Sequence, residues 1–132
     1  MFINRLLNQG AEPMLEETLR FSEARAKLIA ENVANISTPG FKQKDLSIDS
    51  FQKLLSERAS QAEQAAPGSV SFDDIGLDAQ NSQRGMLFHD GQNRSMEGLM
   101  SDMAKNALMH NLAIELLRRQ FQTMEMAIKG QP

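Results

Sequence analysis

Apolar residues recur at alternating spacings of three and four along the C-terminal part of the chain. The positions of this repeat are Met96, Met100, Met103, Ala107, His110, Ile114, Leu117, Phe121, Met124 and Ile128. Nine of these ten residues are apolar, which is typical of a helix that packs in a coiled coil. Ser95 is suitable as its N-cap. The pattern predicts one long helix over 95–129, roughly 50 Å long at 1.5 Å per residue.

A second apolar row crosses the same predicted helix. Its members are Ala104, Leu108, Leu112 and Leu116, and their spacing of four makes the row drift away from the first. One partner helix is too narrow to cover both rows. We therefore expect a helix of the same chain to cover one face and other molecules to cover the rest.

The N-terminal part carries a shorter apolar stripe, interrupted by Ser22. Its members are Leu15, Leu19, Ala26, Ile29, Val33 and Ile36. Pro13 and the glutamates around it suit a first helical turn, and Thr38-Pro39-Gly40 favours a type II turn after the helix. The stripe predicts a helix over 14–37. The predicted fold is mainly α, a single elongated domain (1–132) in which the two terminal helices pack as an antiparallel coiled-coil hairpin.

The middle of the chain, 38–94, lacks a sustained period, and we expect an irregular arm and linker there. Residues 50–58 are compatible with a short helix around Phe51. Residues 59–68 contain no large apolar anchor and are interpreted as a mobile linker. Weak alternation over 70–75 is consistent with a short β element.

Composition narrows the possible functions. The net charge is −3 and no run of Lys and Arg occurs, so no nucleic-acid partner is expected. No stretch approaches the ~18 apolar residues of a membrane span. The N-terminus lacks the apolar core of a cleavable signal peptide, so any export is expected to use another route. Cysteine is absent, which excludes disulfides and thiol chemistry.

Candidate catalytic chemistry is sparse. The only histidines are His89 and His110, and no spacing with the nearby carboxylates Asp73, Asp74 and Asp90 predicts a metal site. His89-Asp90 is interpreted as an ordinary loop pair. His110 interrupts the apolar repeat, where a polar residue either sets the register or is merely tolerated. No enzyme activity, metal or cofactor is predicted.

Two asparagines stand three residues apart near the end of the N-terminal helix. Asn32 and Asn35 share one face there, although asparagine is a mediocre helix former. Either they form hydrogen bonds with the turn that follows, or they are exposed helix-end residues.

The segment from Ala30 to Phe41 reads A-E-N-V-A-N-I-S-T-P-G-F and resembles the motif A-x-N-[IV]-A-N-x-x-T-P-G-[FY] of the axial flagellar proteins, the rod and hook family. The motif and turn residues are Asn32, Asn35, Thr38, Pro39, Gly40 and Phe41. Within that family, the later segments 88–97 and 104–108 resemble proteins of the proximal rod. Ser37 departs from the usual Asp or Asn.

The resemblance implies a structural subunit of the flagellar basal-body rod within the periplasm, exported by the flagellar type III apparatus. It also implies partners: other rod subunits, copies of the chain in a ring or helical tube, and the export-gate junction protein. The predicted assembly interface comprises Leu19, Ile29, Val33, Met100, Met103, Leu108, Ile114, Leu117, Phe121 and Met124. A soluble helical adaptor or secretion chaperone, binding one partner helix in a Met-lined groove, is the alternative.

Overall fold

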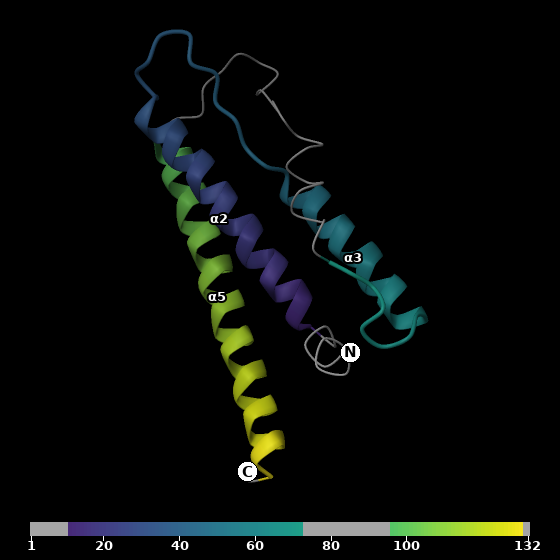
Figure 1. The fold of residues 1–132 in the computed structure, drawn as a ribbon. Coiled ribbons are helices and arrows are strands. Elements are labelled where there is room, and N and C mark those ends of the chain that lie inside the picture. The colour runs from purple at the N-terminus through teal and green to yellow at the C-terminus, as the bar shows by residue number, and fades with distance from the viewer. Residues whose placement is uncertain (1–10, 73–95, 131–132) are drawn as a thin grey trace.

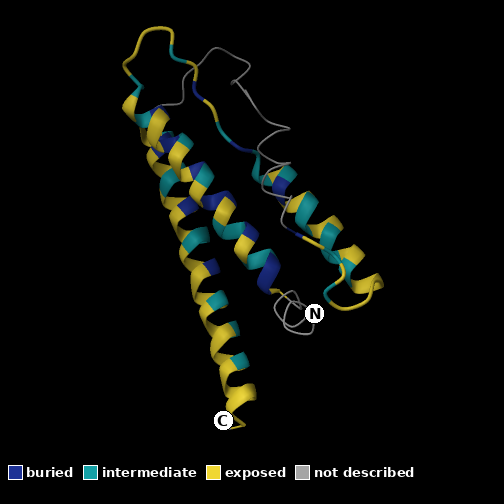
Figure 2. Ribbon diagram, in the orientation of Figure 1, coloured by how far each residue is buried: buried dark blue, intermediate teal, exposed yellow. Residues whose placement is uncertain are grey.

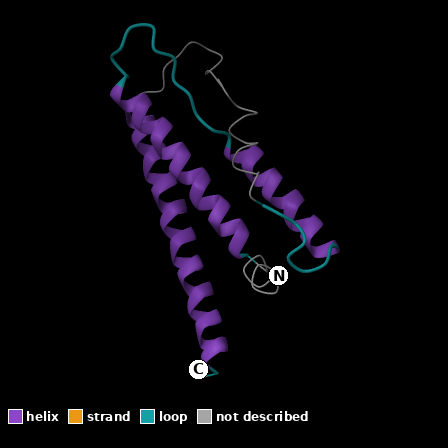
Figure 3. Cartoon of the chain, viewed as in Figure 1, coloured by secondary structure: helices purple, strands orange, loops and turns teal. Residues whose placement is uncertain are grey.

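The computed structural model describes residues 11–72 and 96–130, which form three helices (Figure 1). They are α2 (Glu12–Ala34), α3 (Ile48–Gln64) and α5 (Met96–Lys129). Helix α2 lies between the other two, with α5 on one side and α3 on the other. No strand occurs within 11–72 or 96–130 (Figure 3), so the short β elements expected in the middle are not seen there. Over the same residues, no helix is both long and apolar enough to cross a membrane.

Helices α2 and α5 run antiparallel, which confirms the predicted hairpin. Both ends of α5 fall within one residue of the prediction, whereas α2 starts two residues earlier and stops three residues earlier than predicted. Helix α5 has 34 residues and α2 has 23. The last turns of α5 therefore extend past the start of α2, by roughly 16 Å at 1.5 Å per residue (Figure 1).

Helix α2 begins as its acidic and proline residues predict. Glu12 occupies the first turn, Pro13 follows it, and the Leu15 amide donates to the Ala11 carbonyl at 2.9 Å. The Glu12 side chain is nevertheless buried, and its Oε2 has no hydrogen-bond partner. This burial raises the pKa of the Glu12 carboxyl above its usual value, and the neighbouring Glu16 carboxylate raises it further.

An aromatic core joins α2 to α3. The rings of Phe21 and Phe51 stack with their centroids 4.1 Å apart and their planes 7° from parallel. Leu46 and Phe72 complete the buried cluster, and Met109 of α5 packs against its edge. Phe21 is 0% exposed, yet it lies outside the predicted apolar stripe, because that stripe describes only the face of α2 turned toward α5.

Helix α3 is longer than the sequence pattern suggested. Ser47 caps it by accepting a hydrogen bond from the Ser50 amide at 3.2 Å, and the helix continues to Gln64. The prediction of a linker is therefore wrong for residues 59–64. Alanine, glutamine and glutamate dominate this stretch and favour a helix without a large anchor, while the partly buried Ala62 packs against the aromatic cluster.

The chain turns back after α3. A turn closes where the Ser69 amide donates to the Ala66 carbonyl at 3.0 Å, with Gly68 at φ 74°. Arg58 of α3 then donates to the Ser71 carbonyl at 3.0 Å. This turn brings Phe72 back into the core. The rest of the possible 70–75 strand, together with His89, Asp90 and Ser95, lies outside the described residues.

Replacing Phe51 with Ala should lower the free energy of unfolding by about 3–5 kcal/mol, because it removes a buried ring stacked on Phe21. Chemical denaturation followed by far-ultraviolet circular dichroism measures this loss. Phe51→Leu keeps most of the volume and should cost clearly less. A loss in Phe51→Ala no larger than that of a substitution at an exposed residue would show that the stacked core contributes little.

Replacing Glu12 with Gln should change the pH dependence of stability. The raised pKa means that the folded chain holds this proton more tightly than the unfolded chain, so the wild type loses stability as pH rises above 4.5 toward the folded-state pKa. Glu12→Gln should therefore unfold at a higher temperature than the wild type at neutral pH, and at nearly the same temperature below pH 4.5. Thermal melts across that range provide the check.

Candidate assembly interface

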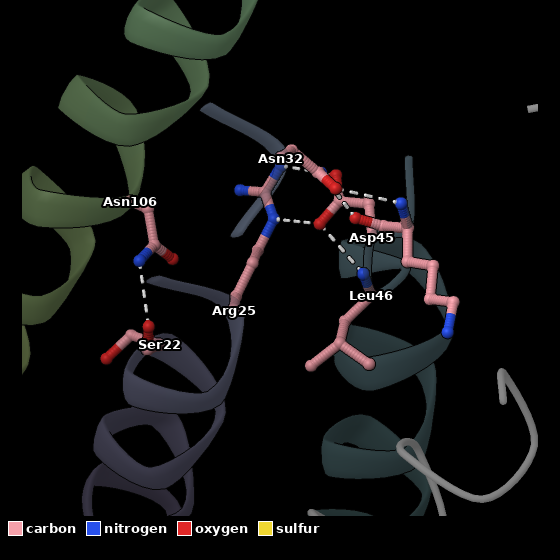
Figure 4. A network of polar contacts seen from close by, with 7 residues as sticks. Ser22, Arg25, Asn32, Asp45, Leu46 and Asn106 are labelled. Carbon is pink, nitrogen blue, oxygen red and sulfur yellow. Dashed lines mark hydrogen bonds and ion pairs between the residues drawn. The ribbon is translucent and has the colours of Figure 1, made fainter. Parts of the chain in front are cut away.

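Asn32 ties the end of α2 to the chain that returns after the turn. Its amide nitrogen donates to the Lys44 carbonyl at 2.7 Å, and its amide oxygen accepts from the Lys44 amide at 3.1 Å (Figure 4). The side chain is buried, so both bonds are shielded from water. Of the two interpretations of this asparagine, hydrogen bonding is the one observed. Its partner, however, lies beyond the turn itself.

An ion pair between the buried Arg25 and the half-buried Asp45 holds the same returning segment. Arg25 donates to both carboxylate oxygens of Asp45, from Nε at 2.9 Å and from the guanidinium Nη2 at 3.0 Å. Asp45 also accepts from the Leu46 amide at 2.7 Å, which places Leu46 in the core (Figure 4). A two-pronged arginine–carboxylate pair fixes orientation as well as distance. The charges of this pair were not identified as interacting from the sequence, because 20 residues separate them.

The turn at the tip of the hairpin has the predicted geometry. The Phe41 amide donates to the Thr38 carbonyl at 3.2 Å, and Gly40 has φ 76°, as the third position of a type II turn requires. Asn35 donates to the Glu31 carbonyl at 2.9 Å and accepts from the Thr38 hydroxyl at 3.2 Å. Asn35 therefore joins the helix end to the turn. Thr38, Pro39 and Gly40 are exposed.

A small polar layer lies within the α2–α5 contact. Asn106 donates from its amide to the Ser22 carbonyl at 2.8 Å (Figure 4). The Ser22 hydroxyl lies 2.7 Å from His110 Nδ1 and donates to the Leu19 carbonyl at 2.8 Å, so the imidazole is the donor in the Ser22–His110 bond. The two residues that interrupt the apolar patterns, Ser22 and His110, thus pair with each other. This favours the register-setting interpretation of His110.

The face of α5 that packs against α2 differs from the face that the predicted repeat marks. Its buried residues are Leu99, Asn106 and Ala113, which are seven apart, and Met103, His110 and Leu117 flank them half-buried. The predicted repeat shares this flanking row. Its members Met100, Ala107 and Ile114 each directly follow one of the three buried residues, and all three are exposed. The members Met96, Phe121 and Ile128 are exposed as well. The pattern therefore located the apolar side of α5 correctly but not its rotation against α2.

The large exposed hydrophobic residues of the described chain all belong to α5. They are Met96, Met100, Leu108, Leu112, Ile114, Leu116, Phe121, Met126 and Ile128. Leu108 is 69% exposed and Ile128 is 76% exposed. Figure 2 shows that α5 is exposed over most of its surface, above all toward its C-terminus. Large apolar surface of this kind marks a site of interaction with another molecule.

The predicted interface residues fall into three groups. Met100, Leu108, Ile114 and Phe121 are exposed on α5. Half-buried positions are Leu19, Val33, Met103, Leu117 and Met124. Ile29 is 1% exposed and packs inside the chain, so it is not available to a neighbouring molecule in this conformation. The described residues contain no group of three or more His, Asp or Glu side chains arranged to hold a metal ion.

Replacing Asn32 with Ala should cost about 1–3 kcal/mol of stability, because it removes both hydrogen bonds between this buried side chain and the Lys44 backbone. Asn35→Ala is the matched control, since its hydrogen bonds are exposed and should contribute about 1 kcal/mol or less. Denaturant titration of both variants measures the difference. A loss for Asn35→Ala that equals or exceeds the loss for Asn32→Ala would contradict this account of the motif.

Comparison with known proteins identifies relatives of similar length. The chain is 27% identical over 128 residues to the flagellar basal body rod protein FlgB of Bacillus subtilis (strain 168), covering 94% of this chain and 97% of that protein. It is 26% identical over 115 residues to the protein of the same name from Borrelia hermsii, covering 80% and 85% respectively. No family model matches, and no solved structure matches significantly. The chain is thus similar over most of its length to two flagellar basal body rod proteins, and the motif at the end of α2 resembles the one seen in axial flagellar proteins.

Proposed function

We propose that this chain is a structural, non-catalytic subunit of the bacterial flagellar basal-body rod and assembles with other rod components. The observation that carries the proposal is the exposed apolar surface of α5, on a chain similar to rod proteins over almost its whole length. Covering this apolar surface with neighbouring subunits would stabilise an assembly. Burial of each leucine, isoleucine or phenylalanine contributes about 1.5–3 kcal/mol when complete.

The mechanical role follows from the shape of the hairpin. Helix α5 is long and straight, and it is supported along only one side by α2. Contacts between its remaining apolar surface and several neighbours would join subunits by many modest interactions. Such an arrangement resists twisting, because rotation of one subunit strains all its contacts together. Torque transmission through the proximal rod is the activity that fits this geometry.

The finer setting belongs to the same proposal. The rod would lie in the periplasm, and the chain would reach it through the flagellar type III apparatus, with the export-gate junction protein among its neighbours. Copies of the chain would stand in a ring or helical tube. The resemblance of the Ala30–Phe41 segment to the axial family supports these expectations.

The alternative of a soluble adaptor or secretion chaperone predicts a different assembly. A chaperone groove would bind one helix and form a discrete soluble complex. The apolar surface of α5 instead extends along both sides of the covered face. Electron microscopy of the assembled material separates the two functions, since the rod function predicts a ring or tube.

Replacing Phe121 with Asp should abolish or strongly reduce swimming of the host bacterium while leaving the monomer folded. Phe121 is 43% exposed on α5, so the charge remains hydrated in the monomer but becomes buried in the assembly. Motility on soft agar and the circular dichroism spectrum of the purified variant are the two measurements.

The control for this experiment is Gln122→Asp, which adds the same charge at the next residue, exposed and polar in the wild type. It should swim normally. Normal swimming of the Phe121→Asp strain would remove Phe121 from the interface. Loss of helicity in that variant would show a folding defect instead.

A further inference from the structure

Methionine is frequent in this chain, and most of it lies in one helix. The chain contains nine methionines but no cysteine, tryptophan or tyrosine. Six of the nine methionines belong to α5. Thiols and thioethers are the side chains that peroxides oxidise most readily. Because no thiol competes here, the thioethers are the groups of this chain that react first with such an oxidant.

Three methionines of α5 are exposed. Met96 is 40% exposed, Met100 is 48% exposed and Met126 is 45% exposed. Met100 follows Met96 by one helical turn, so these two lie side by side on one face near the start of α5. The remaining methionines of the described chain are half-buried at Met14, Met103, Met109 and Met124. An oxidant dissolved in water therefore meets two classes of thioether.

We propose that Met96, Met100 and Met126 are oxidation sites through which hydrogen peroxide prevents the chain from joining the rod. The proposal rests on the proposed rod function and adds a chemical control to it. The thioether sulfur attacks one oxygen of the peroxide, the O–O bond breaks, and proton transfer to the departing oxygen leaves a sulfoxide and water. The sulfur is oxidised by two electrons, and the peroxide is reduced by the same two.

Oxidation at these positions alters the surface of α5. A sulfoxide is polar and accepts hydrogen bonds, so burying it without a donor is unfavourable. The three methionines lie among the large exposed hydrophobic residues of α5, the surface that the proposed function requires neighbouring rod components to cover. In the separate chain, the sulfoxide oxygens stay in water and keep their hydrogen bonds. Oxidation therefore opposes assembly more than it opposes folding.

Met109 provides a contrast within the same helix. It is half-buried and packs against the aromatic cluster that contains Phe21 and Phe51. A sulfoxide there would bring a polar group to the edge of the core and disturb the fold. Burial also limits access of the peroxide to this sulfur. The structure thus exposes the thioethers whose oxidation the fold tolerates and shields one whose oxidation it does not. Enzymatic reduction of the exposed sulfoxides would restore the original surface.

Peptide mass spectrometry of the purified chain, sampled at short times after addition of hydrogen peroxide, tests the selectivity. Met96, Met100 and Met126 should be oxidised several-fold faster than Met109 and the other half-buried methionines. The circular dichroism spectrum should not change while they react. Equal rates at all described methionines would overturn the proposal. Loss of helicity when only the exposed three have reacted would overturn it as well.

The effect on assembly is measured in cells with the variant Met96→Leu/Met100→Leu/Met126→Leu. Leucine keeps an apolar side chain of similar volume and favours a helix, but it is not oxidised by peroxide. A pulse of hydrogen peroxide should lower the amount of newly made wild-type chain in isolated basal bodies several-fold, and lower that of the triple variant much less. Met109→Leu is the matched control and should be as sensitive as the wild type.

Equal losses for the wild type and the triple variant would show that these thioethers do not control incorporation, and would overturn the proposal. If the triple variant is not incorporated even without peroxide, Met100→Leu alone takes its place and should protect in part. Absence of any protection by Met100→Leu would then count against the proposal. The proposed function fails separately, if basal bodies from untreated cells lack the chain, because the oxidation rates of the purified chain do not depend on the rod.

Discussion

Burial of α2 on two neighbouring sides is the constraint on which the rest of this structure depends. One side meets α5 through Ser22, and the other meets α3 and the returning segment through Phe21, Arg25 and Asn32. The exposed residues of this helix, among them Glu16, Glu23 and Lys27, are confined to its remaining face. Helix α5, in contrast, is supported on a single side. The chain thus combines a central helix that is buried on two sides with an outer helix that is buried on one.

The hydrophobic pattern predicted the hairpin because both terminal stripes persist over several turns, and each of the two helices must bury its stripe. The turn was predicted equally well, since Pro39-Gly40 leaves few backbone alternatives. Phe21 was missed because one stripe was sought on a helix that buries two sides. The extent of α3 was missed because its second half is helical by propensity and carries almost no apolar period.

The rotation of α5 could not be predicted from hydrophobicity alone. Periodicity identifies the apolar side of a helix. It does not show whether that side is buried within the chain or by another molecule. Here the face turned to α2 contains Asn106 and His110, and the more apolar repeat stays partly exposed. Likewise, the partners of Asn32 and Arg25 come from residues 12 and 20 positions away, which local patterns do not reveal.

The polar layer of Ser22, Asn106 and His110 removes an ambiguity inherent in a heptad repeat. Sliding α5 along α2 by one heptad would replace Asn106 and His110 by Ala113 and Leu117, or by Leu99 and Met103 in the other direction. Apolar packing would survive either shift, but both hydrogen bonds to Ser22 would be lost. The layer therefore acts as an axial stop. It opposes sliding of one helix along the other when a force acts along the axis of the hairpin.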